Sequence, residues 1–439
     1  AHYKAAQYML LGGEIDRALK LSDTAYDLDP ENADVLATRA SVAYKLGNTD
    51  AALEAANAAL ALDPDHLAAN VLLVTETVDR GEVQAGLAML DEVIAKHPGE
   101  LTVQLMKLRI LETAGMQDQV PAQLKRMIAA FPEVTEIKST LAQWHAQRGE
   151  FAEAETLLRE IAEADPDDTD LALNVVQFIL STRGSEGARE ELKHLIETSV
   201  DIWPFQAALA ALDYSEGRID DAKALLAGVI EEEKTSTSAN AARVQLARIE
   251  IAEGDLDRGA LLVDEVIELD ETHVAALALR AALEIEERRY DDAALTARQA
   301  LAEDPRAVNL LLLAARAYEL NGNTSLASEQ LGLATRVSDY APQVALRYVR
   351  FLRANNQLDD AETVLDETAQ RAPRNLEVLR QLAEVRLSLE DWAGAEEIAQ
   401  TLRRFEGTEE TATRIQAASL TGQQRFGESV TLLQGLASG

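Results

Sequence analysis

The sequence predicts an all-α solenoid built from helical hairpins, and three periodic features carry this prediction. Pro residues recur every 34 residues in the first part of the chain, and Gly residues keep the same step. Ala residues form two further rows at fixed distances from each Gly. A stack of hairpins needs one break at each turn and another between hairpins, so this spacing indicates repeated two-helix units. The Pro series is Pro30, Pro64, Pro98, Pro132 and Pro166, and the Gly series is Gly13, Gly47, Gly81, Gly115 and Gly149.

One unit can be followed from Ala33 to Pro64. Residues 33–46 are helix-forming, and Gly47 ends this run because Gly adopts the left-handed conformation without steric cost. Residues 50–62 form a second run of helix formers. Pro64 ends it, because Pro lacks a donor N–H and disfavours the helical conformation in the residue before it.

The two rows of Ala predict the seam of each hairpin. One row lies seven residues before the turn, and the other lies five residues after it. Small side chains let two helices approach closely, with Leu, Ile and Val around them at helical spacing. The first row is Ala6, Ala40, Ala142, Ala210, Ala247, Ala281, Ala315, Ala383 and Ala417, and the second is Ala18, Ala52, Ala154, Ala222, Ala293, Ala327, Ala361 and Ala395.

These features resemble the tetratricopeptide repeat (TPR) superfamily in unit length, paired small residues, turn Gly and boundary Pro. The resemblance covers nearly the whole chain and implies a right-handed superhelical solenoid of about thirteen helix-turn-helix units, as in long bacterial multi-TPR proteins. Boundary Pro residues return at Pro305 and Pro373. The later turn positions are Gly184, Gly217, Gly254, Arg288, Gly322, Asn356, Glu390 and Gln424.

We interpret residues 1–439 as a single continuous array, because repeats grow by adding neighbours and have no fixed domain size. The step between Gly217 and Gly254 lengthens to 37, and we place the extra residues in a loop over the polar run Lys234–Ser238. This loop is either a tolerated insertion or a hinge between sub-blocks 1–234 and 239–439. All Lys residues lie at or before Lys234, which marks a difference between these blocks.

Composition excludes several classes of function. A net charge of −35 argues against binding nucleic acid or an anionic membrane. The chain has no Cys, so it has no disulfide or thiol chemistry, and no apolar run is long enough for a transmembrane segment. It begins at Ala1 without Met, so we expect that an upstream segment has been removed, and a signal peptide or a lipid-anchor Cys could have been lost with it. Its Ala- and Arg-rich composition is typical of GC-rich bacteria, and we favour the periplasm over the cytoplasm.

Neither catalysis nor a cofactor is expected. The six His residues do not cluster, and none forms an i, i+4 pair of the kind that binds metal on a helix. There is no Gly-rich phosphate loop and no nucleophile elbow. We therefore predict no catalytic residue, no metal site and no cofactor.

The resemblance implies that the first helix of each hairpin lines a groove, through an inner row of residues ten, six and three positions before each turn. In the last six units these positions hold six Arg and two Glu, where about two Arg would fall by chance. Guanidinium groups suit carboxylates of an acidic peptide or an anionic polysaccharide. The alternative is that these Arg residues pair with neighbouring Glu and Asp and only solvate the groove. They are Arg248, Arg316, Arg350, Arg353, Arg380 and Arg414.

The inner row of the first seven units is nearly neutral. Its aromatic members include Tyr44, Phe178 and Tyr214, accompanied by amide and hydroxyl side chains. Such a surface suits an extended peptide or a saccharide chain.

Three functions follow, and the favoured one is a non-enzymatic scaffold that binds a protein partner in its groove. The first alternative is a periplasmic or lipid-anchored accessory of a bacterial exopolysaccharide export system, contacting an anionic polymer. The second is an assembly element that self-associates through the apolar residues of its last helix, such as Val430 and Leu433.

Overall fold

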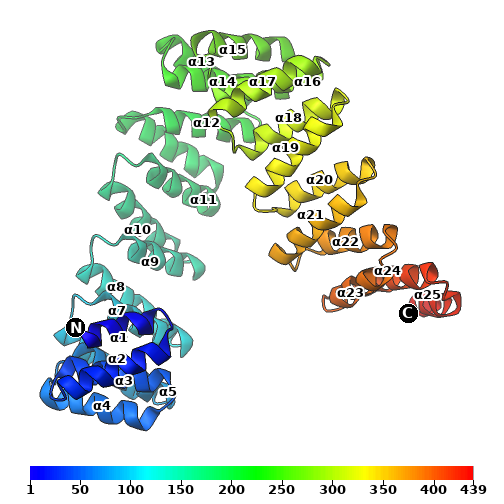
Figure 1. Ribbon diagram of the computed structural model, residues 1–439. Helices are drawn as coiled ribbons and strands as arrows, with labels where there is room; N and C mark the ends of the chain where they lie inside the picture. Colours follow the sequence, from blue (N-terminus) through cyan, green and yellow to red (C-terminus); the bar gives the residue numbers. More distant parts are fainter. Residues whose placement is uncertain (439) are drawn as a thin grey trace. The chain divides into compact units, whose positions relative to one another are not determined.

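The computed structural model describes residues 1–438, and every regular element in this range is helical (Figure 1). The helices are α1 (His2–Leu11), α2 (Ile15–Leu28), α3 (Ala33–Lys45), α4 (Thr49–Leu62), α5 (Leu67–Asp79), α6 (Val83–Lys96), α7 (Leu101–Thr113), η1 (Gln117–Gln119), α8 (Val120–Ala130), α9 (Thr135–Gln147), α10 (Phe151–Ala164), α11 (Thr169–Thr198), α12 (Trp203–Ser215), α13 (Ile219–Glu232), α14 (Thr237–Ala252), α15 (Leu256–Leu269), α16 (Val274–Glu286), α17 (Tyr290–Glu303), α18 (Val308–Leu320), α19 (Thr324–Val337), α20 (Pro342–Ala354), α21 (Leu358–Arg371), α22 (Leu376–Ser388), α23 (Trp392–Leu402), α24 (Glu409–Gly422) and α25 (Phe426–Ser438).

Helix α11 contains both helices of one hairpin. Its Gly184 has φ 78° and ψ −175°, which is not helical. A Cβ added at Gly187 would lie 3.3 Å from Cγ2 of Ile179, although residues eight apart in a straight helix are separated by about 12 Å. The chain therefore reverses at Gly184. Counting α11 twice, the 25 α-helices of residues 1–438 form thirteen hairpins, as predicted.

The turns keep the predicted register even where Gly is absent. The early turn residues, such as Gly47 at φ 76°, have the left-handed conformation. Arg288, Asn356, Glu390 and Gln424 have the same conformation, with φ between 57° and 63°. The repeat therefore continues through the C-terminal units, although their turn residue has changed.

The Ala rows form the hairpin seams. Every Ala predicted for the two rows is buried, with at most 2% of its surface exposed. In two hairpins Gly replaces the second-row Ala: a Cβ at Gly86 would lie 2.5 Å from Val78, and one at Gly259 would lie 2.5 Å from Ile251. The size of the facing residue therefore decides how small the seam residue must be.

The predicted loop over Lys234–Ser238 is partly correct: residues 234–236 lie in the connection between helices, whereas Thr237 and Ser238 are helical. Helix α14 begins at Thr237, and the connection of residues 233–236 has the same length as the connection of residues 63–66. The extra residues lie in α14, which has 16 residues where α16 has 13. The hydroxyl of Ser236 accepts a hydrogen bond from the N–H of Ala239 at 3.0 Å, so this polar run starts a helix instead of breaking one.

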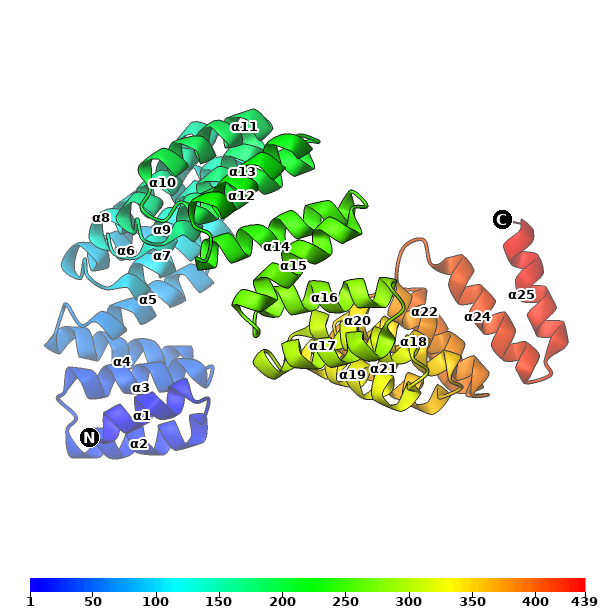
Figure 2. The same ribbon diagram turned by 90° about the horizontal axis from the view of Figure 1, so that it is seen from above.

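The chain divides into two compact units, Ala1–Phe205 and Gln206–Gly439, hereafter unit 1 and unit 2. The sub-blocks 1–234 and 239–439 stay a prediction. Within unit 1 the first helices α1, α3 and α5 contact one another in sequence. Within unit 2 the first helices α14, α16 and α18 do the same, as do α22 and α24 (Figure 2). First helices therefore form one layer of each unit, and second helices form the other.

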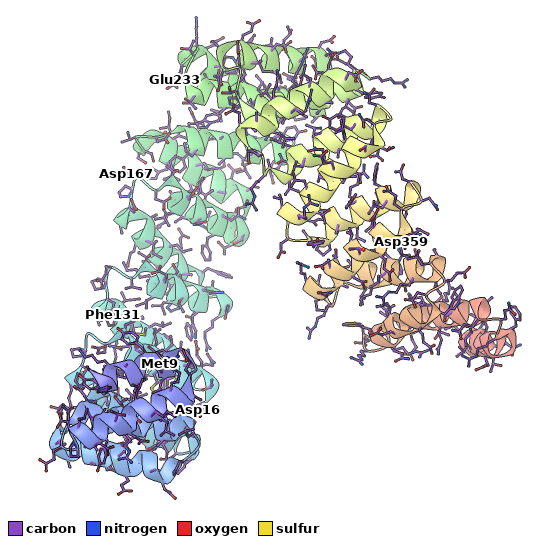
Figure 3. All side chains as sticks on the ribbon, viewed as in Figure 1. Met9, Asp16, Phe131, Asp167, Glu233 and Asp359 are labelled. Carbon is purple, nitrogen blue, oxygen red and sulfur yellow. The ribbon has the colours of Figure 1, made fainter. Side chains whose placement is uncertain are left out.

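Four acidic side chains labelled in Figure 3 lie at or next to a helix end and are exposed: Asp16, Asp167, Glu233 and Asp359. In these positions the negative charges remain hydrated, so a strongly acidic chain can still pack an apolar core.

Candidate functional site

Helices α20 and α22 of unit 2 enclose a hollow of about 530 Å³. We call it the Arg350 hollow. Its wall on α20 consists of Leu346, Arg350, Arg353 and Ala354, of which the first three are the inner-row residues of that hairpin. The wall on α22 consists of Glu377 and Gln381.

Most charges around the Arg350 hollow are already paired. Arg353 lies 3.3 Å from a carboxylate oxygen of Glu384 and donates to the amide oxygen of Gln381. Arg380 binds Glu377 through two hydrogen bonds of 2.9 and 2.5 Å, and it also contacts Glu384. These hydrogen bonds hold the pKa of Glu377 below its usual value. Both Arg residues are therefore committed to neighbouring carboxylates.

Arg350 differs from these two residues. Its side chain is exposed and makes no hydrogen bond or ion pair with any residue in the described range 1–438. Other exposed Arg residues, such as Arg248 and Arg298, also lack a carboxylate partner within the described range, and what distinguishes Arg350 is its place in the wall of this hollow. Arg350 can therefore offer its paired N–H donors to a carboxylate from another molecule.

A second hollow of about 470 Å³ lies on the first helices α12, α14 and α16 of unit 2. Two of the candidate site residues predicted from the sequence, Tyr214 and Arg248, line this hollow, and its remaining lining is mainly apolar. The amide of Gln245 donates to the carbonyl of Ala207 at 3.0 Å and so joins α14 to α12. Arg248 is exposed, and no ion pair of Arg248 occurs in the part of the chain that the structure describes. The lining residues are Ala211, Tyr214, Ala241, Val244, Gln245, Arg248, Ile249, His273 and Ala275.

The two remaining Arg candidates lie in exposed ion pairs. Arg316 on α18 is 3.3 Å from Glu286, and Arg414 on α24 is 2.5 Å from Glu410. Exposed pairs of this kind contribute little to stability. The six Arg candidates thus fall into two groups. Four have carboxylate partners, as expected if these residues only solvate the groove, whereas Arg248 and Arg350 have none.

The aromatic candidates of unit 1 lie in separate hairpins. The hydroxyl of Tyr44 on α3 donates to Asp79, and this hydrogen bond raises the pKa of Tyr44 to about 12. Phe178 on α11 packs edge-on against Phe151, with their ring centres 6.3 Å apart. Both side chains have partners within the protein, so the structure does not join them into one site.

Sequence analysis missed the α22 wall of the Arg350 hollow. Glu377 and Gln381 lie thirteen and nine residues before their turn, outside the inner row. They face α20 because neighbouring first helices present their sides, not only their inner faces, to one another. A search that also included the positions thirteen and nine residues before each turn would have identified Glu377 and Gln381.

Two wider searches of the structure were negative. No group of three or more potential metal-binding side chains occurs within residues 1–438. No helix in the same range is long and apolar enough to cross a membrane.

Comparison with known proteins agrees with this architecture. A family model described as tetratricopeptide repeat matches residues 9–75 and 118–177. These two segments are tetratricopeptide repeats. No curated protein matches this chain.

Several solved structures are similar to this chain at low sequence identity. A crystal structure of yeast Tom70 has 16% identity and a TM-score of 0.43, covering 100% of this chain and 98% of Tom70. A structure of Naa15/Naa10 bound to HypK-THB has 12% identity and a TM-score of 0.38, covering 99% and 79%. Pseudomonas aeruginosa pilF has 18% identity and a TM-score of 0.38, covering 52% of this chain and 98% of pilF.

Proposed function

We propose that this chain is a non-enzymatic scaffold whose unit 2 binds an extended, acidic segment of a partner protein along its first helices. The observation that carries the proposal is Arg350, an exposed guanidinium without a carboxylate partner in a hollow between two first helices. A bound Asp or Glu would supply the missing partner. Leu346, in the same wall, offers apolar contact to the adjoining part of the segment.

The polar groups of the hollow fit a peptide backbone as well as its acidic side chain. Gln381 has an amide that can both donate and accept, and it lies beside Arg353, which already fixes its oxygen. One amide hydrogen of Gln381 is donated to Glu377 at 3.0 Å, which leaves the second to bind a backbone carbonyl. A segment lying along α20 and α22 would thus be held through its backbone and through one carboxylate.

The test uses peptide selection and one substitution. Random twelve-residue peptides displayed on phage would be selected on the intact chain, and enriched sequences would be measured by fluorescence anisotropy. We expect enrichment of Asp and Glu, and about tenfold weaker binding to Arg350→Ser, the effect of removing one charge-assisted hydrogen bond. Binding should also weaken with added salt.

Arg298→Ser is the matched control. Arg298 is exposed on the second helix α17 and has no ion pair within the described residues. The control should bind like the unmodified chain. If the peptides bind Arg350→Ser equally well, or if no acidic sequence is enriched, the proposal fails. Direct binding of polygalacturonate, with no peptide binding, would instead favour the alternative of an anionic polymer.

A further inference from the structure

Neighbouring hairpins meet at a recurrent pair of positions. The residue ten positions after one turn faces the residue eight positions before the next turn. At three of these junctions the pair is acidic and basic: Asp23 with Arg39 at 3.9 Å, Asp91 with Lys107, and Asp264 with Arg280 at 3.1 Å. In these cases two side chains fill the junction and neutralise each other.

Most other junctions within residues 1–438 have no such ion pair at these two positions, and the junction between α19 and α20 is one of them. The corresponding residues are Gly332 and Tyr348. A Cβ on Gly332 would lie 3.4 Å from the hydroxyl oxygen of Tyr348 and 3.4 Å from Nη1 of Arg336. Because Gly332 has no side chain, the hydroxyl of Tyr348 and the guanidinium of Arg336 can lie directly against its backbone, and Gly332 is buried beneath them. A hollow of about 700 Å³ lies at this junction with Gly332 among its lining residues, and we call it the Gly332 hollow.

Polar groups line the Gly332 hollow. The hydroxyls of Ser328 and Tyr348 are 3.1 Å apart and hydrogen-bond to each other. Glu329 and Arg336 are exposed, and neither side chain has a hydrogen bond or ion pair to another residue between 1 and 438. The full lining is Thr324, Ser325, Ser328, Glu329, Gly332, Arg336, Tyr348, Asn355 and Gln357.

This set of groups selects a ligand by its hydrogen bonds and not by its charge. Arg336 supplies donors, Glu329 supplies acceptors, and hydroxyl and amide groups supply both. The one positive and one negative charge cancel, so an ion of either sign would meet a repelling group. An apolar ligand would leave these polar groups unpaired, which is costly. A ligand rich in hydroxyls, with apolar C–H faces for the Tyr348 ring, satisfies all of these conditions.

We propose that the Gly332 hollow is a binding site for a neutral oligosaccharide. The volume of about 700 Å³ admits more than one sugar unit, and the hollow is open to solvent, so a chain can enter from the side. The site uses the second helix α19 and lies outside the inner row of first helices. It is therefore independent of the acidic-peptide site proposed at Arg350.

The test uses four defined probes: cellotetraose, maltotetraose and mannotetraose as neutral sugars, and tetragalacturonate as an anionic one. Binding to the intact chain would be measured by isothermal titration calorimetry and by saturation-transfer NMR. We expect at least one neutral tetrasaccharide to bind and the anionic one to bind more weakly. Gly332→Leu, whose side chain would displace Tyr348 and Arg336 from the lining, should reduce the affinity for that sugar at least about tenfold.

Two further variants make the result decisive. Gly228→Leu is the matched control, since Gly228 also lies in a second helix but a Cβ there would meet nothing within 4 Å. It should bind the sugar like the unmodified chain. Arg336→Ala removes exposed donors without filling the core, so it should also weaken binding, even if Gly332→Leu proved to be misfolded. Absence of binding by all three neutral sugars would overturn the proposal, as would equal binding to the unmodified chain and to Arg336→Ala.

Discussion

Replacing the non-glycine turn residues by Gly should stabilise the C-terminal hairpins. Arg288 and Glu390 have φ values of 62° and 63° and exposed side chains, and neither side chain makes a hydrogen bond or ion pair with another described residue. The left-handed conformation costs such residues about 1–2 kcal/mol, whereas Gly adopts it freely but loses roughly 0.5–1 kcal/mol more backbone entropy on folding. The free energy of unfolding should therefore rise by about 1 kcal/mol for each substitution. Asn tolerates this conformation better, so Asn356→Gly should gain less.

The assay must report on single hairpins, because repeat arrays unfold locally. Native-state hydrogen exchange with peptide-level detection would compare Arg288→Gly in α16–α17 and Glu390→Gly in α22–α23 with the unmodified chain. A gain of about 1 kcal/mol slows exchange of the affected hairpin about fivefold. Glu253→Gly is the control: Glu253 is exposed beside a turn but has φ −79°, so Gly there should speed exchange. The reasoning would be refuted if all three substitutions changed exchange in the same direction.

Three other predictions follow from single contacts. Asp79→Asn should lower the pKa of Tyr44 from about 12 toward 10, which a spectrophotometric titration compared with Tyr44→Phe would detect; an unchanged titration would rule out this hydrogen bond as the cause. Gly422→Ala should cost about 1–3 kcal/mol and move the fluorescence of Trp392 to longer wavelength, because a Cβ at this position would lie 2.4 Å from the indole ring. Finally, Arg159 binds Glu191 through two hydrogen bonds of 2.7 and 2.6 Å and lowers the pKa of Glu191. A lowered carboxyl pKa stabilises the fold above the unfolded-state pKa, and this stability is lost as the pH falls through the folded-state pKa. Thermal melts of the unmodified chain should therefore lose stability in acid more steeply than melts of Arg159→Gln, and parallel curves would contradict this.

The sequence predicted the hairpins well because backbone and packing requirements repeat with them. Ala6 and Ala40 occupy equivalent seam positions, and the register could be followed to Gln424 although Gly had been lost there. The predicted loop over Lys234–Ser238 extends too far for a local reason. A hydroxyl residue both disfavours a helix interior and caps a helix start, and composition alone does not distinguish these roles.

The candidate site was harder to predict, since the side chains at the contacts between hairpins do not repeat from one junction to the next. Two inner-row residues, Arg350 and Arg353, lie in one hollow, but whether each finds a carboxylate depends on residues of the next hairpin, such as Glu384. The Gly332 hollow could not be predicted either. It lies at a junction where Gly332 faces Tyr348, and this becomes visible only when facing positions are compared across junctions.

The 34-residue hairpin also determines how the chain would respond to a pulling force. Each hairpin is held only by its neighbours, so tension applied at the two ends of a unit would detach hairpins one at a time. An extended chain spans about 3.3–3.6 Å per residue, so each rupture would release roughly 110–120 Å of contour length. Within each unit the hairpins would thus detach in steps of similar length. The order in which they detach would rank the stability of the contacts between neighbouring hairpins.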